Sequence, residues 1–279
     1  MSALMQETGR LIYHESFRSA HLDNERRVVV YLPPGYETEP DRRYPTVYLH
    51  DGQNVFESST AAFGIAWDAA RTADKLIHQG RMQPVIQVAI SNTPDRLFEY
   101  APFPDPNVNV NEGRNTAYSQ FLFDEVKPFV DRLYRTRPDR LHTAIVGSSM
   151  GGLSTLSLAW KRHDQFSLCG ILSPSLWWAR NRILRELESD KELEWLRTMK
   201  FWVDMGNKEG GARAVVPPAL QRTRRLIELF DSNGLLPGHD YYYWEVAGGE
   251  HNEAHWAARY DKVLLYFFGL HNYEPSHRS

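Results

Sequence analysis

A serine between two glycines is the first candidate for chemistry in this chain. Residues 147–151, Gly-Ser-Ser-Met-Gly, fit the pattern G-x-S-x-G, and the apolar stretch 143–146 precedes them. A sharp turn from strand to helix here would lift the hydroxyl of Ser149 clear of a sheet and aim free helix N–H groups at an oxyanion. An ordinary Gly/Ser turn would show the same letters, but the position between strand and helix favours a nucleophilic Ser149.

A serine hydroxyl needs a base to take its proton, and histidine is a common choice. Among the histidines after Ser149, His251 lies in a glycine-rich loop directly after an expected strand, 242–246. His255, one helical turn further on, is the rival. We predict His251 as the base. The spacing of the two histidines could also suit a metal, but Asn252 stands where the zinc-protease motif requires Glu, so we expect no metal site.

A carboxylate must orient the histidine. In α/β-hydrolases the acid lies between the serine and the histidine along the chain, at the end of a later strand. The expected strand 201–205 offers Asp204 inside it and Glu209 in the loop that follows. The loop position is where a carboxylate could reach His251, so we predict Glu209 as the acid, with Asp204 second. A solvated loop charge is the alternative interpretation of Glu209.

The oxyanion that forms during attack on a carbonyl needs two backbone N–H donors. One is the N–H of Met150, directly after the nucleophile, and the other is expected in the loop after an early strand. Residues 50–54, His-Asp-Gly-Gln-Asn, occupy that loop. We therefore predict the N–H of Gln53 as the second donor, with a plain turn as the alternative.

Two adjacent tryptophans, Trp177 and Trp178, follow the end of an expected strand. They could line a substrate pocket, because such pockets are mostly apolar with few polar groups. Alternatively, one packs in the core while the other touches solvent. The sequence leaves both interpretations open.

These residues need strands and helices that bring distant segments together. Short β-branched stretches bounded by turn residues predict strands at 28–32, 45–50, 84–90, 141–147, 168–172, 201–205 and 241–246. Apolar residues at helical spacing predict helices at 67–78, 118–133, 153–160, 179–198, 220–230 and 253–268. Pro128 should kink its helix or make it start again, and residues 91–115 should form an irregular loop beside the site. This alternation predicts an α/β fold with a mostly parallel central sheet and helices on both faces.

Composition narrows the class of protein. The chain has 279 residues and a formal net charge of −3, with 32 Lys+Arg against 35 Asp+Glu, so we expect no nucleic-acid partner. No apolar run approaches ~18 residues, so we expect no membrane span. The single cysteine, Cys169, excludes an internal disulfide. Residues 1–10 lack a basic segment followed by an apolar one, so we expect a soluble, cytoplasmic protein, and no linker divides the single domain predicted over 1–279.

Four segments of the chain together resemble a known family. They are His-Asp-Gly-Gln-Asn-Val-Phe at 50–56, Gly-Ser-Ser-Met-Gly-Gly-Leu at 147–153, Ser-Pro-Ser-Leu-Trp-Trp at 173–178 and Gly-Gly-Glu-His-Asn-Glu-Ala at 248–254. They resemble the bacterial "putative esterase" family of α/β-hydrolases. That family holds enterochelin-type siderophore esterases, feruloyl and acetylxylan esterases, S-formylglutathione hydrolases and mycolyltransferases.

The resemblance implies an α/β-hydrolase fold with Ser149 as nucleophile, His251 as base, Glu209 as acid, and an oxyanion hole from the backbone of Met150 and Gln53. It implies a serine esterase that cleaves a small or medium ester of the siderophore, phenolic or sugar class through an acyl-enzyme, without metal or organic cofactor. Two other functions stay open. One is an acyltransferase that uses the same acyl-enzyme, and the other is a non-catalytic protein that binds a ligand or partner.

Overall fold

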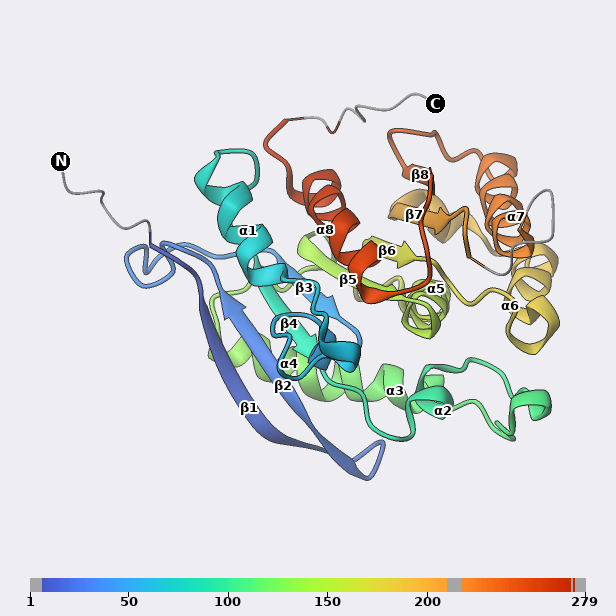
Figure 1. Ribbon diagram of the computed structural model, residues 1–279, viewed down its shortest axis with the longest axis horizontal. Coiled ribbons are helices and arrows are strands. Elements are labelled where there is room, and N and C mark those ends of the chain that lie inside the picture. Colours follow the sequence, from blue (N-terminus) through green and yellow to red (C-terminus); the bar gives the residue numbers. More distant parts are fainter. Residues whose placement is uncertain (1–6, 210–216, 272, 274–279) are drawn as a thin grey trace.

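The centre of the molecule is an eight-stranded sheet in the order β1-β2-β4-β3-β5-β6-β7-β8 (Figure 1). The computed structural model describes residues 7–209, 217–271 and 273. The strands are β1 (Arg10–Ser19), β2 (Asn24–Leu32), β3 (Thr46–Leu49), β4 (Ile86–Ile90), β5 (Thr143–Ser148), β6 (Leu168–Leu172), β7 (Lys200–Gly206) and β8 (Tyr241–Val246). β2 pairs antiparallel with β1 and β4, and all neighbours from β4 to β8 are parallel.

Helices cover both faces of this sheet. They are α1 (Ala69–His78), α2 (Arg96–Tyr100), α3 (Asn115–Gln120), α4 (Lys127–Leu133), α5 (Met150–Arg162), α6 (Trp178–Ser189), α7 (Pro218–Ser232) and α8 (Glu253–Phe268). Helices α1 and α8 lie on one face and α3 to α7 on the other (Figure 1). Their apolar side chains belong to two separate core clusters, one on each face. This arrangement confirms the predicted mostly parallel sheet with helices on both faces.

The central strands are buried on both sides, which is why their sequences are continuously apolar. Successive side chains of a strand point to opposite faces. In β3, Val47 and Leu49 pack with α1 and α8, whereas Tyr48 packs with the opposite cluster. In β5, Val146 and Ile145 divide between the two faces in the same way.

The first strand, β1, was not predicted. Its sequence mixes charged and apolar residues, and most of its side chains are exposed or half-buried because it lies at the edge of the sheet. An edge strand that packs little against helices needs no apolar run, so periodicity does not reveal it.

The predicted irregular loop over 91–115 is wrong in part, because it contains the short helix α2 and ends where α3 begins. A helix of five residues is too short to show a hydrophobic period, and isolated helices of that length are unstable. Tertiary contacts hold it, namely the ion pairs of Glu99 with Arg26 and of Arg96 with Asp51 and the burial of Tyr100 in the core. The sequence alone could not show those partners.

Two helix predictions differ in extent. The helix expected over 179–198 ends at Ser189, and a separate 3₁₀ turn, Glu194–Thr198, follows. Asp190 causes part of this break, since its carboxylate accepts the N–H of Glu192 at 2.9 Å. The helix expected over 118–133 begins at Asn115, and its backbone stays right-handed helical from α3 through the π-helical segment Phe121–Val126 into α4. Pro128 therefore lies inside a continuous helical run, and the π-helical segment directly before it is where the regular hydrogen-bond pattern changes.

Candidate active site

Ser149 lies at the sharp turn between β5 and α5, with φ 57° and ψ −121°. Positive φ is unfavourable for a residue with a Cβ, and such strain gathers at functional sites. Gly147 is needed beside it, because a Cβ there would lie 2.5 Å from the backbone of Gly151. The N–H of Ser149 donates to the carbonyl of Leu172 in β6 at 3.0 Å. The turn is thus fastened to the sheet while the hydroxyl points away from it.

The imidazole of His251 lies between the hydroxyl of Ser149 and the carboxylate of Glu209. Nε2 is 2.8 Å from Oγ of Ser149, and Nδ1 is 2.7 Å from Oε2 of Glu209. An ionised carboxylate only accepts, so Nδ1 carries the hydrogen of a neutral ring and Nε2 is left to accept the serine proton. The side chain of His251 is 44% exposed and that of Glu209 3% exposed. A substrate could therefore reach the base, while the acid is shielded from water.

The buried carboxylate of Glu209 is held at both oxygens. Besides the contact with His251, its Oε1 accepts from the hydroxyl of Ser173 at 2.6 Å and from the N–H of Gly206 at 2.9 Å. Burial alone would raise the pKa of Glu209, but the hydrogen bonds from His251, Ser173 and Gly206 outweigh it and hold the pKa below its usual value. The group is therefore ionised and fixed in orientation.

Ser173 receives two hydrogen bonds as well as making one. Its Oγ lies 3.0 Å from Nε1 of Trp256 and 2.8 Å from Nη2 of Arg259, and both of those atoms only donate. The hydroxyl hydrogen of Ser173 is thus free to go to Glu209. This role of Ser173 and Arg259 was not predicted from the sequence, although a charged residue on the apolar face of α8 is a signal for a buried polar network.

Asp204, the second candidate for the acid, does not contact His251 in the described structure. It is fully buried, with Oδ1 3.2 Å from Arg259 and Oδ2 accepting from Nε1 of Trp202 at 2.8 Å. Burial raises its pKa, although Arg259 and Trp202 act in the opposite direction. Of the two predicted carboxylates, Glu209 is the one placed against the imidazole.

The two predicted oxyanion donors lie on neighbouring loops. Met150 is the first residue of α5, and Gln53 is the second residue of the 3₁₀ turn Gly52–Asn54. Neither N–H has an acceptor within its own helix, because first-turn donors never do. The loops touch near the nucleophile, since a Cβ on Gly151 would lie 3.4 Å from Oδ2 of Asp51.

The two tryptophans occupy different environments. Trp177 is 44% exposed and lines a cavity of about 240 Å³ beside His251. Other apolar residues that line this cavity are Pro174, Met205, Pro218 and Ala219. Trp178 is buried, and its Nε1 donates to the carbonyl of Phe103 at 2.7 Å. The structure thus matches the alternative in which Trp178 packs in the core, so of the two only Trp177 borders the cavity.

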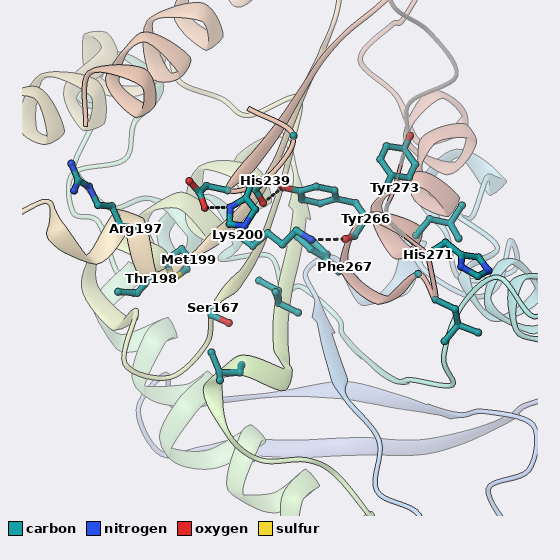
Figure 2. A pocket seen from close by; sticks show the side chains of 17 residues that line it. Ser167, Arg197, Thr198, Met199, Lys200, His239, Tyr266, Phe267, His271 and Tyr273 are labelled. Carbon is teal, nitrogen blue, oxygen red and sulfur yellow. Dashed lines mark hydrogen bonds and ion pairs between the residues drawn. The ribbon is translucent and has the colours of Figure 1, made fainter. Parts of the chain in front are cut away.

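A larger cavity, of about 680 Å³, lies near the amino ends of β6 and β7 (Figure 2). Ser149 lies at the opposite end of the sheet, because it follows the carboxyl end of β5. Two of the cavity's polar side chains, Lys200 and His239, are engaged within the protein. Lys200 donates to the carbonyl of Tyr266 at 3.1 Å, and His239 lies 2.6 Å from a carboxylate oxygen of Asp240 (Figure 2). We therefore place the candidate active site at the carboxyl ends of the strands, around Ser149.

A family model described as "Putative esterase" matches residues 19–267. The chain belongs to this family. The match confirms the resemblance drawn from the four sequence segments.

Three curated relatives show how far the likeness extends. The uncharacterized protein YbbA of Bacillus subtilis is 21% identical over 256 residues, which cover 90% of this chain and 96% of that protein. The endo-1,4-beta-xylanase/feruloyl esterase of Xylanibacter ruminicola is 27% identical over 226 residues, 77% of this chain and 27% of that protein. The iron(III) salmochelin esterase of Escherichia coli is 25% identical over 237 residues, 80% of this chain and 52% of that protein. The chain thus spans only part of the two relatives that carry a named activity.

Solved structures of similar shape show the α/β-hydrolase fold. A ferulic acid esterase superposes with a TM-score of 0.73 at 19% identity, covering 94% of this chain and 98% of that one. The enterobactin esterase FES of Shigella flexneri, solved in the presence of enterobactin, superposes with a TM-score of 0.71 at 18% identity, covering 93% of this chain and 58% of that one. At these identities the likeness establishes the fold.

Proposed function

We propose that this esterase-family protein is a serine carboxylic-ester hydrolase that acts through an acyl-enzyme. The observation that carries the proposal is the line of two hydrogen bonds from Ser149 through His251 to Glu209. A hydroxyl nucleophile, a base and an orienting acid at these distances form the arrangement that acyl transfer requires. Membership of the family supports the same reaction class.

In the proposed reaction, Oγ of Ser149 attacks the ester carbonyl carbon while Nε2 of His251 takes its proton. The N–H groups of Met150 and Gln53 stabilise the negative oxygen that forms, and Glu209 stabilises the protonated imidazole. The bond to the alcohol then breaks, and the alcohol leaves with the proton from His251. Water repeats these steps on the acyl-enzyme, which releases the acid and restores the serine.

The cavity beside His251 is the proposed site for the acyl group or the alcohol group. Its volume of about 240 Å³ and the apolar lining with Trp177 suit a small organic group. We propose a small or medium ester as substrate, of the siderophore, phenolic or sugar class. The names of the feruloyl and salmochelin esterases among the relatives support this class.

The experiment that tests the proposal compares matched variants on p-nitrophenyl acetate. Ser149→Ala and His251→Gln should lose about 10³-fold or more in kcat/KM, because each removes a member of the catalytic line. His255→Gln, which changes the rival histidine in the first turn of α8, should keep wild-type activity.

A fluorophosphonate probe gives an independent readout on the same proteins. It should label the wild-type protein on the peptide that contains Ser149 and leave Ser149→Ala unlabelled. If folded Ser149→Ala hydrolysed the ester at the wild-type rate, the proposal would be contradicted.

A further inference from the structure

The loop that carries Gln53 is fastened by an ion pair outside the line of Ser149, His251 and Glu209. Asp51 is 6% exposed and has a left-handed backbone, φ 55° and ψ 47°. Arg96 of α2 contacts both carboxylate oxygens of Asp51, with Nε 2.6 Å from Oδ1 and Nη2 2.8 Å from Oδ2. Asn92 adds a hydrogen bond to Oδ1 at 2.6 Å. Two-point contact of this kind fixes the direction of a carboxylate as well as its position.

The helix that carries Arg96 is itself fastened to the sheet interior. One turn along α2, the fully buried Glu99 accepts two hydrogen bonds from Arg26 of β2, at 2.7 and 2.9 Å. Residues three apart lie on neighbouring positions of a helix face. The next residue, Tyr100, accepts the N–H of Asp51 on its hydroxyl at 3.1 Å. The short helix α2 thus links the core of the sheet to the loop at Asp51.

The segment 92–96, which runs from Asn92 to the start of α2, also contacts Gln53. The N–H of Asn92 donates to the side-chain carbonyl of Gln53 at 3.1 Å. The peptide N–H of Gln53 is therefore held from both sides, by Asp51 two residues before it and by its own side chain. A displacement of the segment 92–96 would displace this N–H.

We propose that Arg96 and Asp51 are a positioning pair that holds the N–H of Gln53 where the oxyanion develops. This inference rests on the proposed esterase function. Arg96 acts through Asp51, and the effect follows from geometry, because a donor stabilises an oxyanion only when it is aimed at it beforehand. A displacement of about 1 Å can cost as much as ~10²-fold in rate.

The test compares Arg96→Gln with Arg114→Gln. Arg114 is the control, a partly exposed arginine whose Nε lies 3.8 Å from Oε1 of Glu112. For Arg96→Gln we expect kcat on p-nitrophenyl acetate to fall about 10- to 100-fold while KM stays within about threefold. Arg114→Gln should match the wild type.

The inhibition constant of a trifluoromethyl ketone is a second measurement, and it should not change if Arg96 has a purely structural role. Oγ of Ser149 adds to the ketone carbonyl carbon while its proton passes to His251, and the resulting adduct carries an oxyanion. The inhibition constant should therefore rise in Arg96→Gln by the same factor by which kcat/KM falls. Arg96→Lys keeps the charge but loses the two-point contact, so it should show a smaller loss of the same pattern. It also serves as the second variant if Arg96→Gln does not fold.

The outcomes separate the inference from the function on which it rests. A wild-type protein that neither hydrolyses esters nor reacts with a fluorophosphonate at Ser149 overturns both. The positioning pair alone is overturned if the wild type is active and folded Arg96→Gln keeps both the wild-type kcat and the wild-type affinity for the ketone. A change confined to KM overturns it too.

Discussion

Ser173 shows how a single side chain can hold several parts of a site together. It joins Trp256 and Arg259 of α8 to Glu209 in the loop after β7. Its backbone has φ 42°, an unfavourable value for a residue with a Cβ, so the surrounding contacts must hold it there. This connection places the carboxylate opposite His251.

We predict that Ser173→Ala lowers the free energy of unfolding by about 2–4 kcal/mol, because several buried polar groups lose their partner at once. Ser175→Ala is the matched control. Ser175 is also buried, but its hydroxyl lies 3.4 Å from that of Ser149, a weak contact, so its loss should stay below about 1 kcal/mol. Urea unfolding measures both, and equal losses would contradict the role given to Ser173.

The three candidate catalytic residues could be predicted from the sequence, but the residues that hold them in place could not. Ser149, Glu209 and His251 each follow a recognisable strand, and parallel strands end at one edge of a sheet, so their approach could be expected. Ser173 and Arg259 act through contacts between β6, β7 and α8. Local patterns carry no information on such contacts.

Helix α6 begins with an element of the opposite hand. Ala179, Arg180 and Asn181 have φ values of 47°, 56° and 60°. Left-handed backbone costs about 1–2 kcal/mol per residue with a side chain. Asp105 accepts the N–H of Ala179 at 2.9 Å, and Asn181 accepts from Nε of Arg222 at 2.7 Å. These contacts hold the turn that begins two residues after Trp177, which borders the cavity.

We expect Arg180→Gly to keep or slightly raise the free energy of unfolding, by up to about 1 kcal/mol. Glycine relieves the left-handed strain, and this relief offsets its higher entropy in the unfolded chain. Arg185→Gly, at an exposed position further along α6 whose guanidinium contacts the carbonyl of Arg180, should cost at least about 1 kcal/mol. Chemical denaturation of both proteins measures the difference. A loss at Arg180 as large as that at Arg185 would show that the turn is not strained.

The helices and strands that could be predicted from the sequence are mainly those that bury a large apolar surface. The central strands were found because both of their faces are apolar, and the long helices because their stripes repeat over several turns. β1 lies at the edge and α2 depends on distant ion pairs, so neither left a local pattern. The left-handed turn of α6 likewise leaves no periodic signal, because its residue types are ordinary ones.

For the molecule as a whole, folding should depend on pH through a histidine inside the core. His50 is 2% exposed, and its Nδ1 contacts the hydroxyl of Tyr118 at 2.8 Å. Burial lowers its pKa to about 4; Asp51 acts in the opposite direction and Arg96 adds to the lowering. Between that value and ~6.5, the unfolded chain binds a proton that the folded chain does not, so stability decreases as the pH falls.

We predict that the free energy of unfolding falls more steeply with decreasing pH in the wild type than in His50→Asn. The difference in slope should approach about 1.4 kcal/mol per pH unit between roughly pH 6 and 4.5. The two curves should run parallel between about pH 7 and 8, where a histidine of ordinary pKa is neutral in both states. Urea titrations at each pH measure the curves, and parallel curves over the whole range would contradict the assignment.

The described part of the chain contains no helix with the length and apolar character that crossing a bilayer requires. The cytoplasmic location and the single domain over 1–279 stay predictions.

The attachment of the site to the sheet has a consequence for protein engineering. Ser149, Glu209 and His251 follow the carboxyl ends of β5, β7 and β8. Neighbouring strands of a sheet lie about 4.8 Å apart, so the sheet itself sets the spacing of these residues. Helix α8 supplies Trp256 and Arg259 to the support of Glu209, whereas α6 and α7 contribute shape around the cavity without setting this spacing. Chimeras that exchange those helices with a distant relative could therefore retain the reactive groups while they acquire a different substrate preference.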